Sequence, residues 1–241
     1  MPGVVEADDL GTYVLKFRGA GQGEKVLIAE LIVGEIARYL ELPVPELVFA
    51  DLDERIGRNE PDPEIQDLIT SSAGLNLAMD YLPGAFAFDA QDTERVDPDL
   101  ASAIVWLDAF VTNIDRTPRN TNLLIWGGNT WLIDHGASLY SQYGGPDFPE
   151  KAQQRFPAIR DHVLLPAASH ISEADERLSQ QLTEPVIREI VGLVPDEWLN
   201  DRNFEDGPTQ HREAFVRFLV DRLNGPREFV QEALDARSAL V

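Results

Sequence analysis

The sequence predicts an α+β fold in which a strand-rich N-terminal third precedes a helical C-terminal two thirds. Short β-rich runs are concentrated before residue 84, and a β-hairpin pattern follows at residues 122–134. Apolar residues recur at helical spacing from residue 97 and again beyond residue 150. With 241 residues, 44% of them hydrophobic, the chain can form one domain or two closely packed lobes, and we expect the boundary near residue 84.

The N-terminal third begins with the segment TYVLKF, residues 12–17, whose alternation predicts a strand with Lys16 near its end. Apolar residues at helical spacing then predict a helix over residues 24–40, which the segment LPVPE ends. ELVFADL, residues 46–52, predicts a second strand. Residues 53–74 are acidic and contain two prolines, so we expect a long loop there. LNLAMDYLPG, residues 75–84, predicts a strand that runs into a turn.

In the remaining chain, Asp97 and Pro98 form a helix-start signal, and the apolar face that follows predicts a helix ending just before Asn113. NLLIW, GGNT and WLID then predict a hairpin whose second strand ends at Asp134. Beyond residue 150 we expect three helices, at 173–194, 209–223 and 226–238.

Composition and charge exclude several classes of function. The chain has no cysteine, which excludes disulfides, thiolate metal sites and a cysteine nucleophile. The N-terminal segment lacks a basic stretch followed by an apolar run, and no eighteen apolar residues follow one another, so we expect a cytoplasmic protein without a membrane partner. Acidic residues outnumber basic ones by 42 to 20, and the net charge of −22 repels phosphate backbones. We therefore expect no nucleic-acid partner.

Glu30 is the first candidate for a role in chemistry. Its neighbours at i±3 and i±4 in the predicted helix are apolar residues and a glycine, so it either reaches solvent or finds a partner elsewhere in the chain. Lys16 lies on the strand just before this helix. A strand lysine paired with a helix glutamate is held fixed and can place its ammonium group on a nucleotide phosphate.

Asp115, Asn120 and Asp134 form a second candidate group. Asn120 follows Asp115 by five positions in the loop after a helix, and Asp134 ends the predicted hairpin. Singly, each residue type is common in turns and at strand ends. Together they favour one site, in which one aspartate accepts a hydroxyl proton while an asparagine oxygen and a second carboxylate hold Mg²⁺ on ATP phosphates.

These motifs carry a resemblance to a known family. NIDRTPRN resembles a kinase catalytic loop, and IDHG resembles the metal-binding Asp-Phe-Gly segment with His135 in place of phenylalanine. With the lysine of YVLKF, the helix AELIVGEIARYLELPVPE and the segment MDYLPG, the chain is similar over residues 5–140 to HipA-like kinases, a bacterial branch of the protein-kinase-like fold. The resemblance implies two lobes with ATP between them: a small β-rich N-lobe, residues 1–84, and a larger helical C-lobe, residues 85–241.

The resemblance also implies individual roles. Lys16 would contact the ATP phosphates, Glu30 would orient Lys16, and Asp115 would be the catalytic aspartate. Asn120 and Asp134 would hold magnesium.

Other positions follow from the same resemblance. Backbone groups of the hinge segment would line the adenine pocket: Met79, Asp80, Tyr81 and Leu82. Asn122 is a rival metal ligand. HipA-like loops commonly carry a histidine two residues after the aspartate, where this chain has Thr117. Arg116 and Arg119 are the candidates to supply the missing positive charge instead.

The expected function is an ATP- and Mg²⁺-dependent phosphotransferase acting on a Ser or Thr hydroxyl, with ATP and an unidentified protein acceptor as partners. One alternative is a small-molecule kinase similar to aminoglycoside and homoserine kinases. Another is a non-catalytic pseudokinase that serves as an interaction module. Kinase-like folds place a glycine-rich loop before the lysine strand, whereas only fifteen residues precede Lys16 and only MPG corresponds to such a loop. We therefore expect a late start or a reduced phosphate loop, which favours the pseudokinase.

Overall fold

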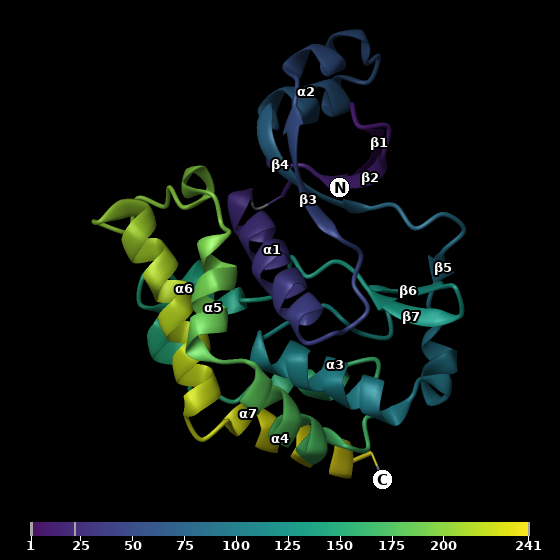
Figure 1. The fold of residues 1–241 in the computed structure, drawn as a ribbon, viewed down its shortest axis with the longest axis vertical. Coiled ribbons are helices and arrows are strands. Elements are labelled where there is room, and N and C mark those ends of the chain that lie inside the picture. The colour runs from purple at the N-terminus through teal and green to yellow at the C-terminus, as the bar shows by residue number, and fades with distance from the viewer. Residues whose placement is uncertain (1, 22, 241) are drawn as a thin grey trace.

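A four-stranded antiparallel sheet lies at one end of the molecule and a helical body at the other (Figure 1). The computed structural model describes residues 2–21 and 23–240. The strands are paired in the order β1-β2-β4-β3, with bounds Pro2–Glu6 for β1, Thr12–Lys16 for β2, Leu47–Leu52 for β3 and Gly74–Asp80 for β4. The strands expected from TYVLKF, ELVFADL and LNLAMDYLPG are confirmed, whereas the sequence patterns did not predict β1. In the register of β2 and β4, Lys16 lies opposite Leu77.

Helix α1, Glu24–Tyr39, confirms the helix expected after β2, and it is buried on nearly all sides. Eleven of its sixteen residues are buried, which is typical of a helix inside a core. It contacts β3 and β4 on one side and, on the other, α5 (Glu184–Gly192) and the 3₁₀ turn Asp196–Trp198. Its apolar side chains therefore belong to the large core that the helical body shares.

The expectation of a long loop at residues 53–74 is wrong, because the segment contains a 3₁₀ helix, Glu54–Asn59, and helix α2, Pro63–Ser71. Pro63 occupies the first turn of α2, where its missing N–H costs nothing, and the Asp62 carboxylate caps the helix by accepting from the Glu64 N–H at 2.9 Å. α2 covers the sheet through Ile69, which joins Leu15, Leu52 and Ala78 in a small second core.

The hairpin and the helix before it are present. α3 spans Pro98–Phe110, β6 Leu123–Trp126 and β7 Asn129–Leu132, and β5, Phe86–Ala87, adds a third strand beside β6. Asp134 lies two residues beyond β7 rather than at its last residue, in a left-handed conformation with φ 56°.

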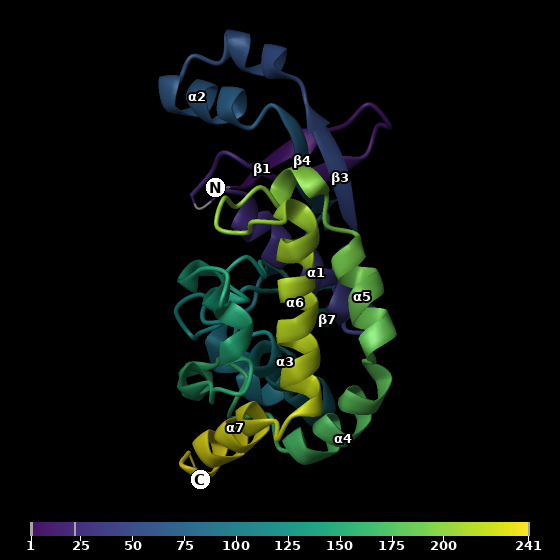
Figure 2. The same ribbon diagram turned by 90° about the vertical axis from the view of Figure 1, so that its left-hand side faces the viewer.

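The helices beyond residue 150 differ from expectation at one point. The single helix expected over 173–194 is two helices, α4 (Ile171–Gln181) and α5, because Leu182 and Thr183 are extended and Pro185 starts the next helix. α6, Gly207–Asn224, packs beside α5, and α7, Glu228–Ser238, closes the base of the body under α3 and α4 (Figure 2). In the described part of the chain, no helix is long and apolar enough to cross a bilayer.

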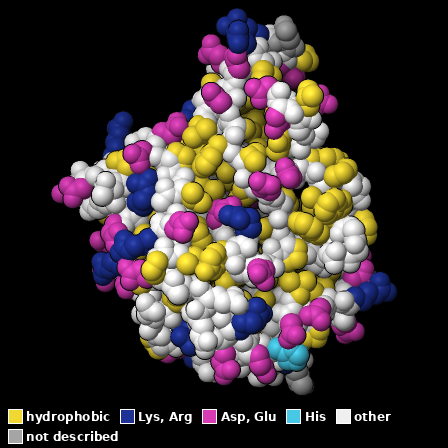
Figure 3. Space-filling model, in the orientation of Figure 1, with side chains coloured by type: hydrophobic (Ala, Val, Ile, Leu, Met, Phe, Trp, Pro, Cys, Tyr) yellow, Lys and Arg dark blue, Asp and Glu magenta, His cyan; other side chains and the backbone are white. Residues whose placement is uncertain are grey.

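The surface agrees with the charge of the sequence. Acidic side chains are scattered over the face shown in Figure 3, with basic ones singly between them. Apolar side chains gather there over the β5–β7 sheet, where Phe86 is 62% exposed.

Candidate active site

The structure brings Lys16, Glu30 and Asp134 together from β2, α1 and the segment after β7. The Lys16 Nζ lies 3.4 Å from the Glu30 Oε2 and donates to the Asp134 Oδ1 at 2.7 Å. Lys16 is 9% exposed and Glu30 1% exposed, so Glu30 does not reach solvent. The side chain of Asp134 is 46% exposed and faces outward from this buried pair.

Burial and the neighbouring charges shift the pKa values of Lys16, Glu30 and Asp134 in opposite directions. Burial alone would lower the pKa of Lys16, but the carboxylates of Glu30 and Asp134 outweigh it and raise that pKa. Burial raises the pKa of Glu30, and the neighbouring Lys16 only partly offsets this effect. For Asp134, burial would raise the pKa, but the Lys16 ammonium dominates and lowers it. Lys16 is therefore a cation and Asp134 an anion at neutral pH.

Gly136 allows the segment after Asp134 to approach α1 closely. A Cβ atom at this position would lie 2.5 Å from the Val26 Cγ1 and 3.4 Å from the Glu30 Oε2. Real side chains do not tolerate the first distance, so only glycine fits without displacing α1. Gly136 thus has a steric role in keeping Asp134 beside Lys16.

The loop after α3 holds Asp115 through two asparagines. The Asp115 Oδ2 accepts from the Asn120 Nδ2 at 2.6 Å and from the Asn122 Nδ2 at 3.4 Å. Since a carboxylate only accepts, each amide presents its nitrogen to Asp115 and keeps its oxygen for another partner. A tight turn fixes the loop, with the Thr117 N–H donating to the carbonyls of Asp115 and Asn120, both at 3.0 Å. Asn120 is exposed, whereas Asn122 is buried.

A buried network that sequence reasoning missed lies beneath this loop. Asp108, on α3, accepts from the Arg116 Nε at 2.5 Å, the Asn113 Nδ2 at 2.9 Å and the His162 Nε2 at 2.9 Å. The His162 Nδ1 accepts from the Leu164 N–H at 3.0 Å, which leaves the proton on Nε2 for Asp108. Burial would raise the pKa of Asp108, but Arg116 and His162 outweigh it and hold that pKa far below its usual range. The signal available in the sequence was an aspartate within the otherwise apolar α3.

Arg116 connects the two candidate loops. Its guanidinium donates to the carbonyl oxygens of Asn122 and of Ile133, the residue before Asp134, the latter at 3.2 Å. Its Nη2 lies 3.3 Å from the His135 Nδ1. Burial, reinforced by the charge of Arg116, lowers the pKa of His135 to about 3, so His135 is a neutral ring that accepts from Arg116. Arg116 is therefore committed to buried contacts.

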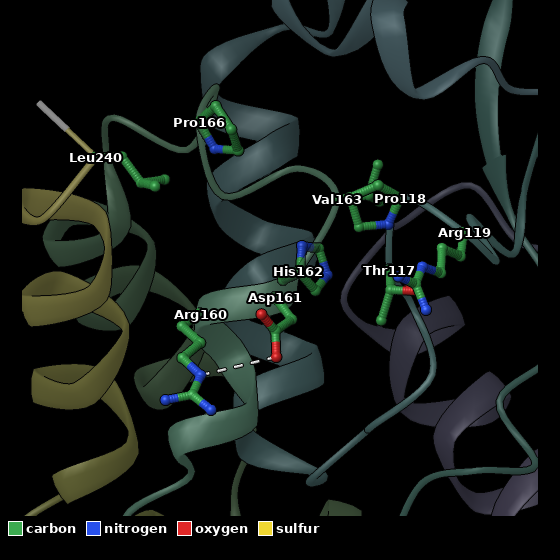
Figure 4. Close-up of a pocket in the computed structure, with 9 residues that line it drawn as sticks. All are labelled: Thr117, Pro118, Arg119, Arg160, Asp161, His162, Val163, Pro166 and Leu240. Atoms are coloured by element: carbon green, nitrogen blue, oxygen red, sulfur yellow. Dashed lines mark ion pairs between the residues drawn. The ribbon is translucent and has the colours of Figure 1, made fainter.

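Arg119, by contrast, is exposed, and its guanidinium makes no ion pair with any described residue. It lies on the wall of a cavity of about 610 Å³ (Figure 4).

The hinge segment, residues 79–82, comprises the last two residues of β4 and the two that follow it. Met79 and Leu82 are buried, Asp80 is half-buried and Tyr81 is exposed. The N–H groups of Asp80 and Tyr81 donate within the sheet, to the carbonyls of Glu46 at 2.9 Å and Thr12 at 3.1 Å. Within residues 2–21 and 23–240, the N–H of Leu82 has no acceptor, so it is the hinge donor left for a ligand.

The donor set around Asp134 and Asn120 suits a hard cation. Mg²⁺ takes carboxylate and amide oxygens and keeps several waters, so one or two protein ligands suffice. The Asp134 Oδ1 is engaged by Lys16, which leaves its Oδ2, and Asn120 has its amide oxygen. Among the residues the structure describes, no group of three or more histidines and acids gathers as a self-sufficient metal site. The arrangement fits a cation shared with a phosphate ligand.

Comparisons with known proteins show the fold and the family of the chain. The chain is similar to the crystal structure of the Helicobacter pylori proinflammatory kinase CtkA, with a TM-score of 0.58 and 13% sequence identity, over 99% of this chain and 94% of that one. At this identity the likeness shows a shared fold, mixed α/β and similar to a kinase. No curated protein matches the sequence. The sequence model of the HipA-like kinases matches residues 2–231, and the chain therefore belongs to the HipA-like kinase family.

Proposed function

We propose that this protein is an ATP- and Mg²⁺-dependent phosphotransferase that acts on a Ser or Thr hydroxyl of a protein. The observation that carries the proposal is the ion-paired group of Lys16, Glu30 and Asp134, joined through Arg116 to the loop that holds Asp115. Membership of the HipA-like kinase family supports the reaction class.

In this proposal residues 1–84 and 85–241 form two lobes, and ATP lies between them. Adenine rests against Met79 and Leu82, and the free N–H of Leu82 donates to it. Lys16, fixed by Glu30, places its positive charge on the phosphates, because a buried ion pair leaves it little rotational freedom.

Asp115 would orient the acceptor hydroxyl and receive its proton. Its Oδ2 is held by the two asparagines, which leaves Oδ1 for the acceptor. The Asp134 Oδ2 and the Asn120 amide oxygen would hold Mg²⁺, which neutralises charge on the transferred phosphoryl group. Arg119, exposed beside Asn120, would add a positive charge near the same group.

One observation favours a second candidate, a nucleotide-binding pseudokinase. The turn between β1 and β2, residues 7–11, contains Asp8, Asp9 and a single glycine, Gly11. Carboxylates repel phosphates, and such a turn lacks the glycines of a phosphate-binding loop. This candidate keeps the nucleotide site and loses the transfer step.

Thermal denaturation with and without ATP and Mg²⁺ tests the nucleotide site. A ligand at a hundred times its Kd stabilises by about 2.7 kcal/mol, which raises the Tm of a chain of this size by roughly 5–10 °C. We expect Asp134→Ala to lose the magnesium-dependent part of this rise, and Asp67→Ala, the same change at an exposed site on α2, to keep it. No rise with the unaltered protein at millimolar ATP would contradict both candidates.

Phosphate transfer from labelled ATP separates the candidates. A kinase transfers label to protein acceptors, or to small alcohols if it is a small-molecule kinase, and Asp115→Ala abolishes transfer while keeping the thermal shift. A thermal shift without transfer to any acceptor identifies the pseudokinase. Equal transfer by the Asp115 variant would refute the assignment of Asp115.

A further inference from the structure

The loop that carries Asp115 and Asn120 forms one wall of the cavity of about 610 Å³ (Figure 4). Residues 117–119 lie on this wall and residues 160–163 on another, with Pro166 and Leu240 at the far end. Pro118, Val163 and Pro166 make much of the lining apolar. The cavity is large enough for several residues of an extended peptide.

The charges in this cavity are opposite to the charge of the whole chain. The lining contains two arginines, Arg119 and Arg160, and one aspartate, Asp161, whereas the whole chain has a net charge of −22. Among the residues that the structure describes, Arg160 pairs only with Asp161, at 3.7 Å, and both side chains are mostly exposed, at 72% and 67%. An exposed pair at this distance is worth little, so both arginines remain available to a ligand. His162, another polar side chain of the lining, is buried and bonds to Asp108.

The cavity shares lining residues with the surface beside the proposed active site. A second cavity, of about 580 Å³, shares Pro118 and Arg119 with the first and is also lined by Asn120 and Asn122. Both asparagines bond to Asp115. In the proposal below, an extended peptide seated in the first cavity continues past Pro118 and Arg119 toward Asp115.

We propose that this cavity binds an acidic segment of the acceptor protein, adjacent to the Ser or Thr that receives the phosphate. The inference rests on the proposed function and adds a substrate class to it. The planar guanidinium group of Arg160 matches a carboxylate in a two-pronged geometry, and Arg119 adds positive charge where the cavity meets the loop of Asp115. The wall of Pro118, Val163 and Pro166 contacts the apolar parts of the peptide. Elsewhere the acidic surface repels such a segment, so selectivity arises where the arginines lie.

Fluorescence anisotropy with two labelled peptides tests the inference without requiring catalysis. One peptide carries a serine flanked by glutamates, and the other has glutamines in their place. We expect the acidic peptide to bind at least about tenfold more tightly, since a charge-assisted hydrogen bond is worth about 1.5–3 kcal/mol. Arg160→Glu abolishes this preference, whereas Arg177→Glu, the same reversal on the exposed face of α4, keeps it.

Equal binding of both peptides by the unaltered protein, or an unchanged preference in Arg160→Glu, overturns the inference. The thermal shift with ATP and Mg²⁺ is measured on the same proteins. Because Arg160 lies outside the nucleotide site, that shift is expected to persist in Arg160→Glu. Equal binding of the two peptides by the unaltered protein, with an intact shift, refutes the acceptor site alone. A missing shift in the unaltered protein refutes the proposed function, whatever the peptides show. Label transfer to dephosphorylated casein, an acidic protein, over myelin basic protein gives the corresponding preference in catalysis.

Discussion

Replacing Asp108 by asparagine removes the negative charge on which Arg116, Asn113 and His162 converge beneath the loop that carries Asp115. Asp108 is fully buried and accepts from Arg116, Asn113 and His162. Asparagine has nearly the same shape, so the change creates no cavity. The substitution leaves the charge of Arg116, which is 1% exposed, without a counter-charge. It also places an amide N–H₂ or a neutral oxygen where three donors converge.

The expected loss of stability is large for a single substitution. Removing one partner of a buried ion pair costs about 3–5 kcal/mol, because the other charge stays buried. In a chain of this length each kcal/mol lowers the Tm by about 2–4 °C, so Asp108→Asn should lower it by roughly 6–20 °C. Since the folded-state pKa of Asp108 is lowered, its contribution is fully present at neutral pH and is lost as the pH falls below about 4.

Calorimetry at neutral pH checks this value with a double-mutant cycle. Arg116→Met alone should also be strongly destabilising, because it leaves Asp108 unpaired. The double variant should lose less than the sum of the two, because it removes both buried charges. Asp67→Asn, at an exposed site, should change stability by less than about 0.5 kcal/mol. A loss below 1 kcal/mol in Asp108→Asn, or full additivity in the cycle, would refute the network as an ionic one.

Three further substitutions follow from the packing. His135 has a folded-state pKa of about 3, below its value of about 6.5 when unfolded, so stability falls as the pH drops below 6.5, by about 2 kcal/mol at pH 5. His135→Phe should remove this part of the slope between pH 7.5 and pH 5, and an unchanged slope would contradict the shift. Gly136→Ala should cost about 1–3 kcal/mol in urea unfolding through its clash with Val26, and Val26→Ala should recover part of the loss. The Arg222 guanidinium donates to four backbone carbonyls, and Arg222→Met, which leaves them without this donor, should cost at least about 3 kcal/mol of stability. Arg217→Met, at an exposed site, should cost under about 1 kcal/mol. Similar melting temperatures for the two variants would be evidence against a stabilising role of the Arg222 hydrogen bonds.

Local patterns predicted those parts of the fold that depend on local sequence. The periodicity of residues 24–40 and the Asp97-Pro98 start signal gave the two central helices, because spacing and caps act within one segment. The same rules failed at Pro63, which was interpreted as a loop residue but lies in the first turn of α2. Asp62 and Pro63 form the same local start signal as Asp97 and Pro98, with the Asp62 carboxylate as the cap. The acidic, proline-containing composition of the segment was given more weight than this signal.

In the candidate site too, the sequence predicted some of the residues and missed others. Lys16 and Glu30 were singled out because an acid without a local partner requires a distant one, and the structure places them in contact. Asp108 posed the same question within α3, but its partner His162 lies 54 positions away in a segment with no recognisable motif. That contact depends on how 3₁₀ turns and short loops pack, which spacing rules do not describe.

The burial of α1 sets the lifetime of the ion pair that it supports. Glu30 lies at the middle of a helix whose apolar side chains are shared with the large core, so the helix cannot swing away without opening that core. Local opening of α1 then costs nearly as much as unfolding the whole chain. Its backbone amides are accordingly among the last to exchange with solvent, and Glu30 remains beside Lys16 for as long as the chain is folded.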